Sequence, residues 1–426
     1  MVSQTTMTSR ERILRTIAGE PVDRVPIFAP LPWHPLQPAP TPGDWHTEAN
    51  YQALVARAAE VCDFFVQLEI PERTSFRNAG GAYGLGGVPE GIFDRRFLLV
   101  PPENVELLNA VSSAGATEYR YAVHTPRGVL TTVEAIRPGE DTVWEIEPLV
   151  KSVEDAESLL SAPYRFDKPD MSSYYARRTE LGERGVAVCF ISSPLVMVSR
   201  LTGFQRFLEW TVTEKSLVER LIRAAHERVA ERLQYVLAND AGPIFRFGGS
   251  EQATPPMMSG RAFDRYIIGY ERPLWEMVRA AGRIAWVHCH GRVRTAIDKF
   301  VDGGVQVLDP TEPPPQGDIE IGEAKRLAAR GPMTLVGNIE FSELESRIPD
   351  EIEEQVRTAI VDGGKKYFIL GASAEVIAGV SDRLRDNILA FIDAGLRYGV
   401  MDQGARGAGF GSLSSRHPDG RLRKGN

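Results

Sequence analysis

The 426-residue chain contains only three cysteines, Cys62, Cys189 and Cys289, and they lie far apart in the sequence. So few thiols cannot build a disulfide framework, which favours a reducing, cytoplasmic location. No apolar run approaches the roughly 20 residues that a membrane-spanning helix requires, and the polar N-terminal segment lacks the apolar stretch of a secretory signal. Basic side chains are in the minority, so the net charge is −8. Nucleic acid and anionic membranes are therefore poor candidate partners, and a small-molecule substrate is the better expectation.

Short apolar runs alternate with amphipathic stretches of helical period along most of the chain. This alternation is typical of βα units around a parallel sheet, and eight such runs predict a (β/α)8 TIM barrel over residues 9–400. A doubly wound open sheet is the alternative. The predicted strands are Val25–Ala29, Phe64–Leu68, Val186–Ile191, Ile244–Phe247, Ile284–His288, Val305–Leu308, Thr334–Val336 and Tyr367–Leu370.

The region from Pro71 to Pro163 interrupts this rhythm. Within it, Glu118–His124 and Val129–Ile136 alternate with period two and are bounded by Gly- and Pro-containing turns, which predicts a β-hairpin-rich insertion after the second strand. We expect this insertion to cap the C-terminal mouth of the barrel. The Gly/Ser/Arg-rich segment 402–426 is expected to be a disordered tail.

Polar residues close five successive apolar runs. In a barrel such positions converge on the C-terminal face, where functional groups gather, although any one of them alone could be a helix N-cap. The residues concerned are Ser250 and Glu251 after the fourth strand, His288 and His290 at the fifth, Asp309 and Glu312 at the sixth, Asn338 and Glu340 at the seventh, and Ser373 and Glu375 at the eighth.

His288-Cys289-His290 is the sharpest local signal. Alternation along a strand places His288 and His290 on the same side, with Cys289 opposite. Two imidazoles and a carboxylate could hold zinc with one position open. The alternative is a core histidine with a hydrogen-bonding partner beside a second histidine in the following loop.

Several segments resemble the uroporphyrinogen decarboxylase/cobalamin methyltransferase superfamily. RERILRTIAGEPVDRVPIF is similar to its opening segment, and AWVHCHGRV, GGVQVLDPTE and LVGNIE are similar to its strand 5 to strand 7 core. The resemblance runs from about Ser9 to Gly399. It implies a TIM barrel with its site at the C-terminal mouth, and either metal-free porphyrinogen decarboxylation or zinc-dependent methyl transfer involving a corrinoid protein. Homodimers are common among barrels of this kind.

The loop after the first strand, Pro30 to Gln37, lacks the arginines that hold substrate carboxylates in the decarboxylases. The insertion also looks more like the methyltransferase branch, so we expect a corrinoid-linked methyltransferase or demethylase, with a metal-free decarboxylase of the same family as the alternative. That branch carries His-x-Cys after strand 5 and a Cys after strand 8. Here His290 replaces the first Cys, and GASAEVIAGVSD contains none. The resemblance implies zinc on His288, His290 and Glu312, with Glu375 and Glu340 as further candidate ligands.

The remaining site predictions follow from the chemistry that such a zinc site would perform. Zinc would act as a Lewis acid on a heteroatom of the methyl donor or acceptor, and a carboxyl group would handle the proton. The expected catalytic residues are Glu251, Asp309 and Glu340, and the expected substrate-binding residues are Trp33, His34, Tyr83, Asn338 and Ser373.

Overall fold

The computed structural model describes residues 7–401 except 41–43, 69, 71–99, 101, 114 and 138–142. Its main body is a curled sheet of seven parallel strands in the order β1-β6-β7-β8-β9-β10-β11. This α/β arrangement is TIM-like and confirms a parallel sheet with helical crossovers. The strands are β1 (Phe65–Gln67), β6 (Val186–Ser192), β7 (Ile244–Gly248), β8 (Ile284–His288), β9 (Val307–Thr311), β10 (Thr334–Ile339) and β11 (Phe368–Ala372).

The predicted first strand is reduced to a short segment around Ile27. The N–H of Phe28 donates to Leu370 O at 2.8 Å, Leu370 N–H donates to Pro26 O at 3.0 Å, and Asp63 N–H donates to Ile27 O at 2.8 Å. The segment therefore bonds to β11 on one side and to the residues before β1 on the other. It does not extend into a full strand because Pro26 has no N–H to donate.

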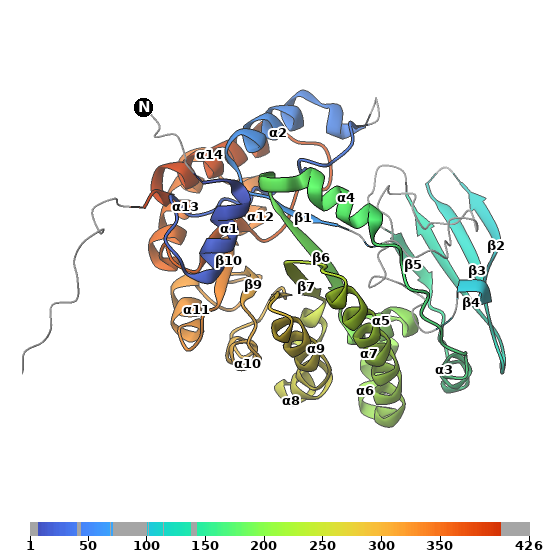
Figure 1. The fold of residues 1–426 in the computed structure, drawn as a ribbon. Coiled ribbons are helices and arrows are strands. Elements are labelled where there is room, and N and C mark those ends of the chain that lie inside the picture. Colours follow the sequence, from blue (N-terminus) through green and yellow to red (C-terminus); the bar gives the residue numbers. More distant parts are fainter. Residues whose placement is uncertain are drawn as a thin grey trace, which may run out of the picture.

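The helices between the strands lie over the sheet (Figure 1). In α9, for example, Glu271, Leu274, Trp275 and Val278 are buried with the spacing of one helix face. The helices are α1 (Ser9–Ala18), α2 (Ala49–Val61), α3 (Val153–Leu160), α4 (Ser172–Leu181), α5 (Pro194–Thr202), α6 (Phe204–Thr213), α7 (Lys215–Ala238), α8 (Gly260–Phe263), α9 (Gly269–Ala280), α10 (Ile297–Asp302), α11 (Ile321–Ala328), α12 (Phe341–Ser346), α13 (Pro349–Gly363) and α14 (Asp382–Gly399), with short turns η1 (Trp45–Thr47), η3 (Pro102–Asn104), η4 (Gly182–Arg184), η5 (Ser250–Ala253) and η6 (Asp264–Ile268). No helix in the described part of the chain is long and apolar enough to cross a membrane.

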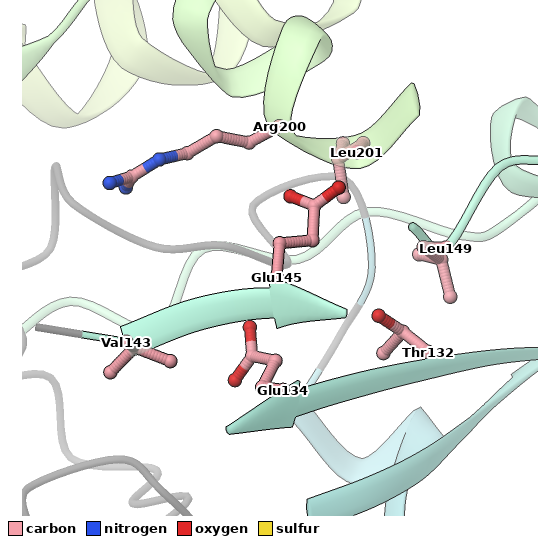
Figure 2. A pocket seen from close by; sticks show the side chains of 7 residues that line it. All are labelled: Thr132, Glu134, Val143, Glu145, Leu149, Arg200 and Leu201. Carbon is pink, nitrogen blue, oxygen red and sulfur yellow. The ribbon is translucent and has the colours of Figure 1, made fainter. Parts of the chain in front are cut away.

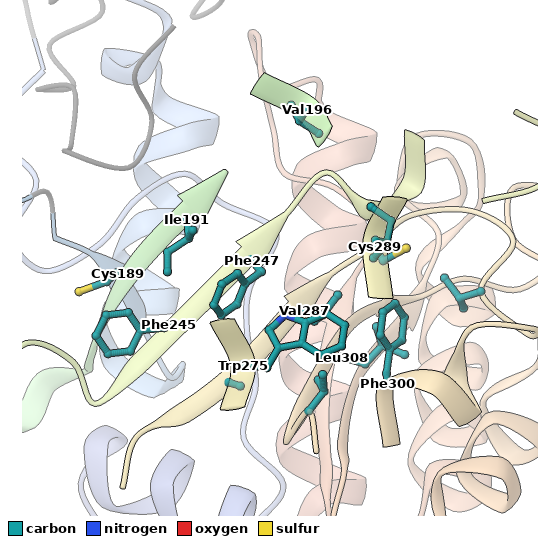
Figure 3. Close-up of a cluster of buried hydrophobic side chains, with 14 of the residues drawn as sticks. Cys189, Ile191, Val196, Phe245, Phe247, Trp275, Val287, Cys289, Phe300 and Leu308 are labelled. Atoms are coloured by element: carbon teal, nitrogen blue, oxygen red, sulfur yellow. The ribbon is translucent and has the colours of Figure 1, made fainter. Parts of the chain in front are cut away.

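The two faces of the strands enter different apolar clusters. One face forms an interior cluster that includes Val188, Ile244, Trp286 and Val307, and Ile13 and Ile17 of α1 pack against it. The other face packs against the helices: Figure 3 shows Phe245, Phe247, Val287 and Leu308 of the strands near Trp275 of α9 and Phe300 of α10. This alternation decides which side chains can reach the inside of the sheet.

The insertion forms a four-stranded antiparallel sheet in the order β2-β3-β4-β5. Its strands are β2 (Val105–Ser112), β3 (Thr117–Thr125), β4 (Gly128–Ile136) and β5 (Val143–Glu147). The predicted β-segments Glu118–His124 and Val129–Ile136 correspond to β3 and β4, paired through a tight turn at Thr125–Gly128. The sheet stands on the opposite side of the molecule from α13 and α14 (Figure 1).

A pocket at the junction of this sheet with α5 is lined by Thr132, Glu134, Val143, Glu145, Leu149, Arg200 and Leu201 (Figure 2). None of these residues belongs to the strand ends at which the sequence places the site. The glycine-rich part of the predicted insertion and the predicted tail 402–426 lie outside the described residues.

Candidate active site

Three charged or polar side chains take the next inward positions above the apolar interior of the sheet. Arg246 follows Ile244 by two residues, His288 follows Trp286, and Asp309 follows Val307, so all three continue the inward face. Arg246 Nη2 lies 2.6 Å from Asp309 Oδ2 and 2.7 Å from His288 Nδ1. His288 Nδ1 is in turn 2.9 Å from Asp309 Oδ2. We refer to Arg246, His288 and Asp309 as the inner polar layer.

The inner polar layer keeps Asp309 ionised. Burial opposes the charge, but Arg246 and His288 together hold the pKa of Asp309 well below its usual range. The Trp286 indole N–H donates to the same carboxylate from below. Because Asp309 stays deprotonated at neutral pH, these contacts favour a role in holding Arg246 and His288 over the proton transfer suggested by the sequence.

His290 and Glu312 form a second pair next to this layer. Nδ1 of His290 lies 2.9 Å from Glu312 Oε1, and the Gly291 N–H donates to Glu312 Oε2. The His288 and His290 rings are perpendicular, with centroids 4.6 Å apart, so the two imidazoles lie together as strand alternation predicts. Burial disfavours the imidazolium of His290, but the bond to Glu312 outweighs it and raises the pKa of His290. This pair therefore has the character of a hydrogen-bonded ion pair.

Glu340 is a buried acid with one unpaired oxygen. Its Oε2 accepts from Ser373 Oγ at 2.9 Å, and that hydroxyl accepts from the Phe341 N–H at 3.0 Å. Oε1 is buried without a hydrogen-bond partner. Burial, assisted by the nearby charge of Glu312 and opposed by the Ser373 bond, raises the pKa of Glu340 to about 7. This carboxyl group can therefore hold and release a proton near neutral pH.

Two further acids stand close to these groups. Burial raises the pKa of Glu375 to about 7, with Arg246 opposing and Asp309 adding to the shift. The Glu375 side chain is nevertheless open to solvent, so water can stabilise its charge. Glu340 is therefore the better proton donor.

Glu251, in η5, has a buried Oε2 without a hydrogen-bond partner. Its charge contributes to the raised pKa of His290.

The other predicted substrate-binding residues are placed differently. Trp33 packs edge-on against Phe64, with centroids 5.4 Å apart, and His34 Nδ1 accepts from the Leu36 N–H at 3.1 Å. Burial and Arg177 of α4 lower the pKa of His34 to about 4. Phe64 directly precedes β1 and Arg177 lies on α4, so these contacts are with residues outside the strand ends, and substrate binding by Trp33 and His34 stays a prediction.

Asn338 is half-buried on β10, opposite Gly371 of β11. Ser373 contacts Glu340 as described above, so the structure brings it to the proton-holding acid. Tyr83 lies outside the described residues.

The arrangement does not fit the expected zinc site. Among the residues that the structure describes, no group of three or more His, Cys, Asp or Glu side chains is arranged to hold a metal ion. Glu312 already accepts from His290 and from the Gly291 N–H. The Arg246 guanidinium lies 2.7 Å from His288 Nδ1, so a fixed positive charge already stands at that ring nitrogen. We therefore assign no metal-dependent step to these residues.

Arg246 is a site residue that was not predicted from the sequence. The predicted site residues follow the apolar runs, whereas Arg246 lies within one, in Ile244-Phe245-Arg246-Phe247. The available signal was strand alternation, because an arginine between two phenylalanines that face the helices must itself face the interior. Its side chain is 27% exposed, so it is accessible from the mouth.

Comparison with known proteins identifies the family of the chain. Residues 136–397 match the family model of uroporphyrinogen decarboxylase (URO-D), which is more than half of the chain. The chain belongs to the uroporphyrinogen decarboxylase family. This membership supports an enzyme, and the inner polar layer and Glu340 fall within the matched region.

A solved structure supports the fold of this family member. A methyltransferase from Methanosarcina mazei has 14% sequence identity and a TM-score of 0.54, with 92% of this chain and 99% of that chain covered, and at this identity the likeness concerns the fold alone. A B12-independent methionine synthase from Shewanella sp. W3-18-1, in complex with selenomethionine, has 12% identity and a TM-score of 0.35, with 69% and 75% covered. A search of curated proteins gives no match.

Proposed function

We propose that this family member is a corrinoid-linked methyltransferase or demethylase, in which Glu340 protonates the heteroatom that loses the methyl group. The proposal rests on the burial and the raised pKa of Glu340. It is 6% exposed, its Oε1 has no hydrogen-bond partner, and its pKa is raised to about 7. A buried carboxylic acid with a free oxygen, beside polar groups from neighbouring strand ends, suits general acid catalysis.

The charge of the site favours methyl transfer over removal of a carboxylate from a polycarboxylated substrate. Its acids are Glu251, Asp309, Glu312, Glu340 and Glu375, and its only guanidinium in the inner polar layer, Arg246, is already paired with Asp309. Several substrate carboxylates would meet like charges there, whereas a neutral methylated compound would not. We therefore favour a methoxylated or similar small substrate.

The proposed step transfers a methyl group from the substrate heteroatom to the acceptor. The bond between the methyl carbon and the substrate heteroatom breaks, the heteroatom keeps the electron pair and takes the Glu340 proton, and the methyl group passes to the acceptor. A corrinoid, delivered as a cosubstrate on a partner protein, supplies the nucleophile that accepts the methyl group. Ser373 orients Glu340 through its 2.9 Å hydrogen bond, and the inner polar layer fixes the floor of the site.

A decarboxylase acting on a substrate with one carboxylate is the second candidate. The observation in its favour is Arg246, which donates to Asp309 through Nε and Nη2 and remains partly exposed. Its outer face could pair with a single carboxylate, in keeping with the name of the family. In that reaction Glu340 would protonate the carbanion left by loss of carbon dioxide.

The test supplies the purified protein with reduced cobalamin and, in turn, methoxylated aromatics and methylamines, and follows methylcobalamin by its absorbance. We expect turnover with at least one donor and a loss of about 100-fold in kcat for Glu340→Gln, the typical contribution of a general acid. Glu353→Gln is the matched control, because Glu353 of α13 pairs with Arg397 of α14 and belongs to none of the strand ends. Full activity in Glu340→Gln contradicts the role of Glu340. Release of carbon dioxide from a monocarboxylate, without methyl transfer from any donor, favours the decarboxylase.

A further inference from the structure

A carboxyl group that the proposed mechanism does not use is fully buried behind the candidate site. Glu271 begins the buried face of α9 and is 0% exposed. Ser250 Oγ donates to its Oε2 at 3.2 Å, and the Ser193 hydroxyl is close enough to stabilise the charged form of the carboxyl group. Both serines are 0% exposed. Burying a carboxyl group this deeply is costly, and an apolar side chain of similar size would avoid the cost.

The two serines belong to the ends of neighbouring strands. Ser193 follows β6, its N–H donates to Gly248 O of β7 at 2.9 Å, and its hydroxyl caps α5. Ser250 is the first residue of η5, the short turn after β7 that carries Glu251. Glu271 therefore connects α9 to the ends of both β6 and β7.

A second contact set holds the same turn from the side of α5. Gly249 packs so closely on Val196 that a Cβ at position 249 would lie 2.1 Å from Val196 Cγ2. Ser199 Oγ donates to Gln252 Oε1 at 2.5 Å. The turn η5 is thus clamped between α5 and α9, and Glu271 is the polar group on the α9 side.

This clamp acts on the candidate site through Glu251. Glu251 follows Gly248 by three residues, and Gly248 is the β7 residue paired with His288 at the end of β8. The charge of Glu251 therefore stands at the strand end next to the imidazole pair, where it contributes to the raised pKa of His290. A shift of η5 would move that charge relative to His290, whose partner is Glu312. The position of η5 therefore determines the electrostatic surroundings of the imidazole pair.

We propose that Glu271 is a positioning residue that anchors η5 through Ser250 and so fixes Glu251 at the strand end next to the imidazole pair. The structural part of this inference stands on the hydrogen bond to Ser250 and on the packing of η5 against α5, and its catalytic consequence rests on the proposed function. Glu271→Gln keeps the shape and the hydrogen-bonding capacity of the side chain, whereas Glu271→Leu keeps only its bulk. Glu276→Leu, on the exposed face of the same helix, is the matched control.

The first measurement is amide hydrogen exchange followed by mass spectrometry, which needs no substrate. In Glu271→Leu we expect amides of residues 250–254 to exchange at least about tenfold faster than in the wild type, because a buried hydrogen-bonding anchor of the turn is lost. Glu271→Gln and Glu276→Leu should exchange there as the wild type does. Ser250→Ala removes the same contact from the other side and serves if Glu271→Leu does not fold. Unchanged exchange of residues 250–254 in whichever of these two variants is folded overturns the proposal.

The second measurement is the methyl-transfer assay described above. Loss of positioning should lower kcat about tenfold in Glu271→Leu with little change in KM, and Glu271→Gln should restore most of it. Equal loss in both variants overturns the positioning role, since the conservative change then fails to rescue. If the wild type transfers no methyl group at all, the proposed function fails while the exchange measurement still decides whether Glu271 holds η5.

Discussion

Replacing Asp309 with asparagine tests whether the inner polar layer depends on a buried negative charge. Asp309 is 5% exposed and accepts hydrogen bonds from Arg246, His288 and Trp286. The amide keeps the shape but leaves the Arg246 guanidinium without its counter-charge. Breaking a fully buried ion pair costs about 3–5 kcal/mol. Since the Arg246 side chain is 27% exposed, water recovers part of that cost, and we expect a loss of about 2 kcal/mol in the free energy of unfolding.

Urea unfolding at pH 7 measures this loss, with Asp302→Asn as the control. Asp302 pairs with Arg330 at 3.0 Å, but both side chains are more than half exposed, so its loss should cost at most about 1 kcal/mol. The pH dependence of this loss provides a second test. Because the pKa of Asp309 is held below its usual range, its charge contributes fully to the free energy of unfolding above pH about 4. That contribution decreases as pH falls further, because the unfolded chain takes up the proton first.

The difference between wild type and Asp309→Asn should therefore be largest at neutral pH and should narrow below pH about 4. Two results would refute the reasoning. One is a loss at pH 7 that does not exceed that of Asp302→Asn by at least about 0.5 kcal/mol, the usual scatter of surface substitutions. The other is a difference that stays constant under acidic conditions, because a lost charge cannot produce it.

Four further outcomes are expected. Asp63→Ala should lower the free energy of unfolding by about 3–5 kcal/mol in thermal or urea unfolding, because this 0% exposed carboxylate accepts from two buried arginines, Arg12 and Arg24. A loss no larger than that of Asp393→Ala, which removes an exposed partner of Arg57, would contradict this. Methyl transfer should decline as pH rises through about 7, where Glu340 loses its proton, and a flat profile in this range would remove Glu340 as the donor. Purified protein should contain no stoichiometric zinc, and zinc that disappears in a His288→Ala/His290→Ala double variant would restore the metal site. Finally, we expect no conversion of uroporphyrinogen to coproporphyrinogen, and product detected by fluorescence would revive the porphyrinogen decarboxylase.

The sequence predicted the parallel sheet because its strands are short apolar runs between turn residues. The runs at Ile244–Phe247 and Ile284–His288 appear as β7 and β8 with nearly the same bounds. The run at Val25–Ala29 does not become a full strand, since Pro26 interrupts its donors. Period-two alternation also located β3 and β4 of the inserted sheet.

The site could be predicted only in part, because strand ends are local features and side-chain partners are not. Pairing of His290 with Glu312 depends on how β8 and β9 align, and alternation alone cannot provide that register. The loop containing Trp33 and His34 was expected at the mouth, yet the carbonyl oxygens of Pro35 and Leu36 accept from Arg184 and Arg177. These long-range bonds hold the loop against α4 and η4, and the residues of the loop itself do not predict them.

The two acids most important to the proposed chemistry differ in protonation because they differ in the donors around them. Asp309 is surrounded by a guanidinium, an imidazole and an indole N–H, so its charged form is stabilised despite burial. Burial and the negative charge of Glu312 favour the protonated form of Glu340, and the hydroxyl hydrogen bond from Ser373 offsets them only in part. Environments that separate two carboxyl groups in this way assign them different tasks. Asp309 is suited to hold the cationic floor of the site, and Glu340 is suited to give up a proton at neutral pH. Exchanging these tasks would require moving Arg246, which strand alternation fixes beside Asp309 and away from the end of β10.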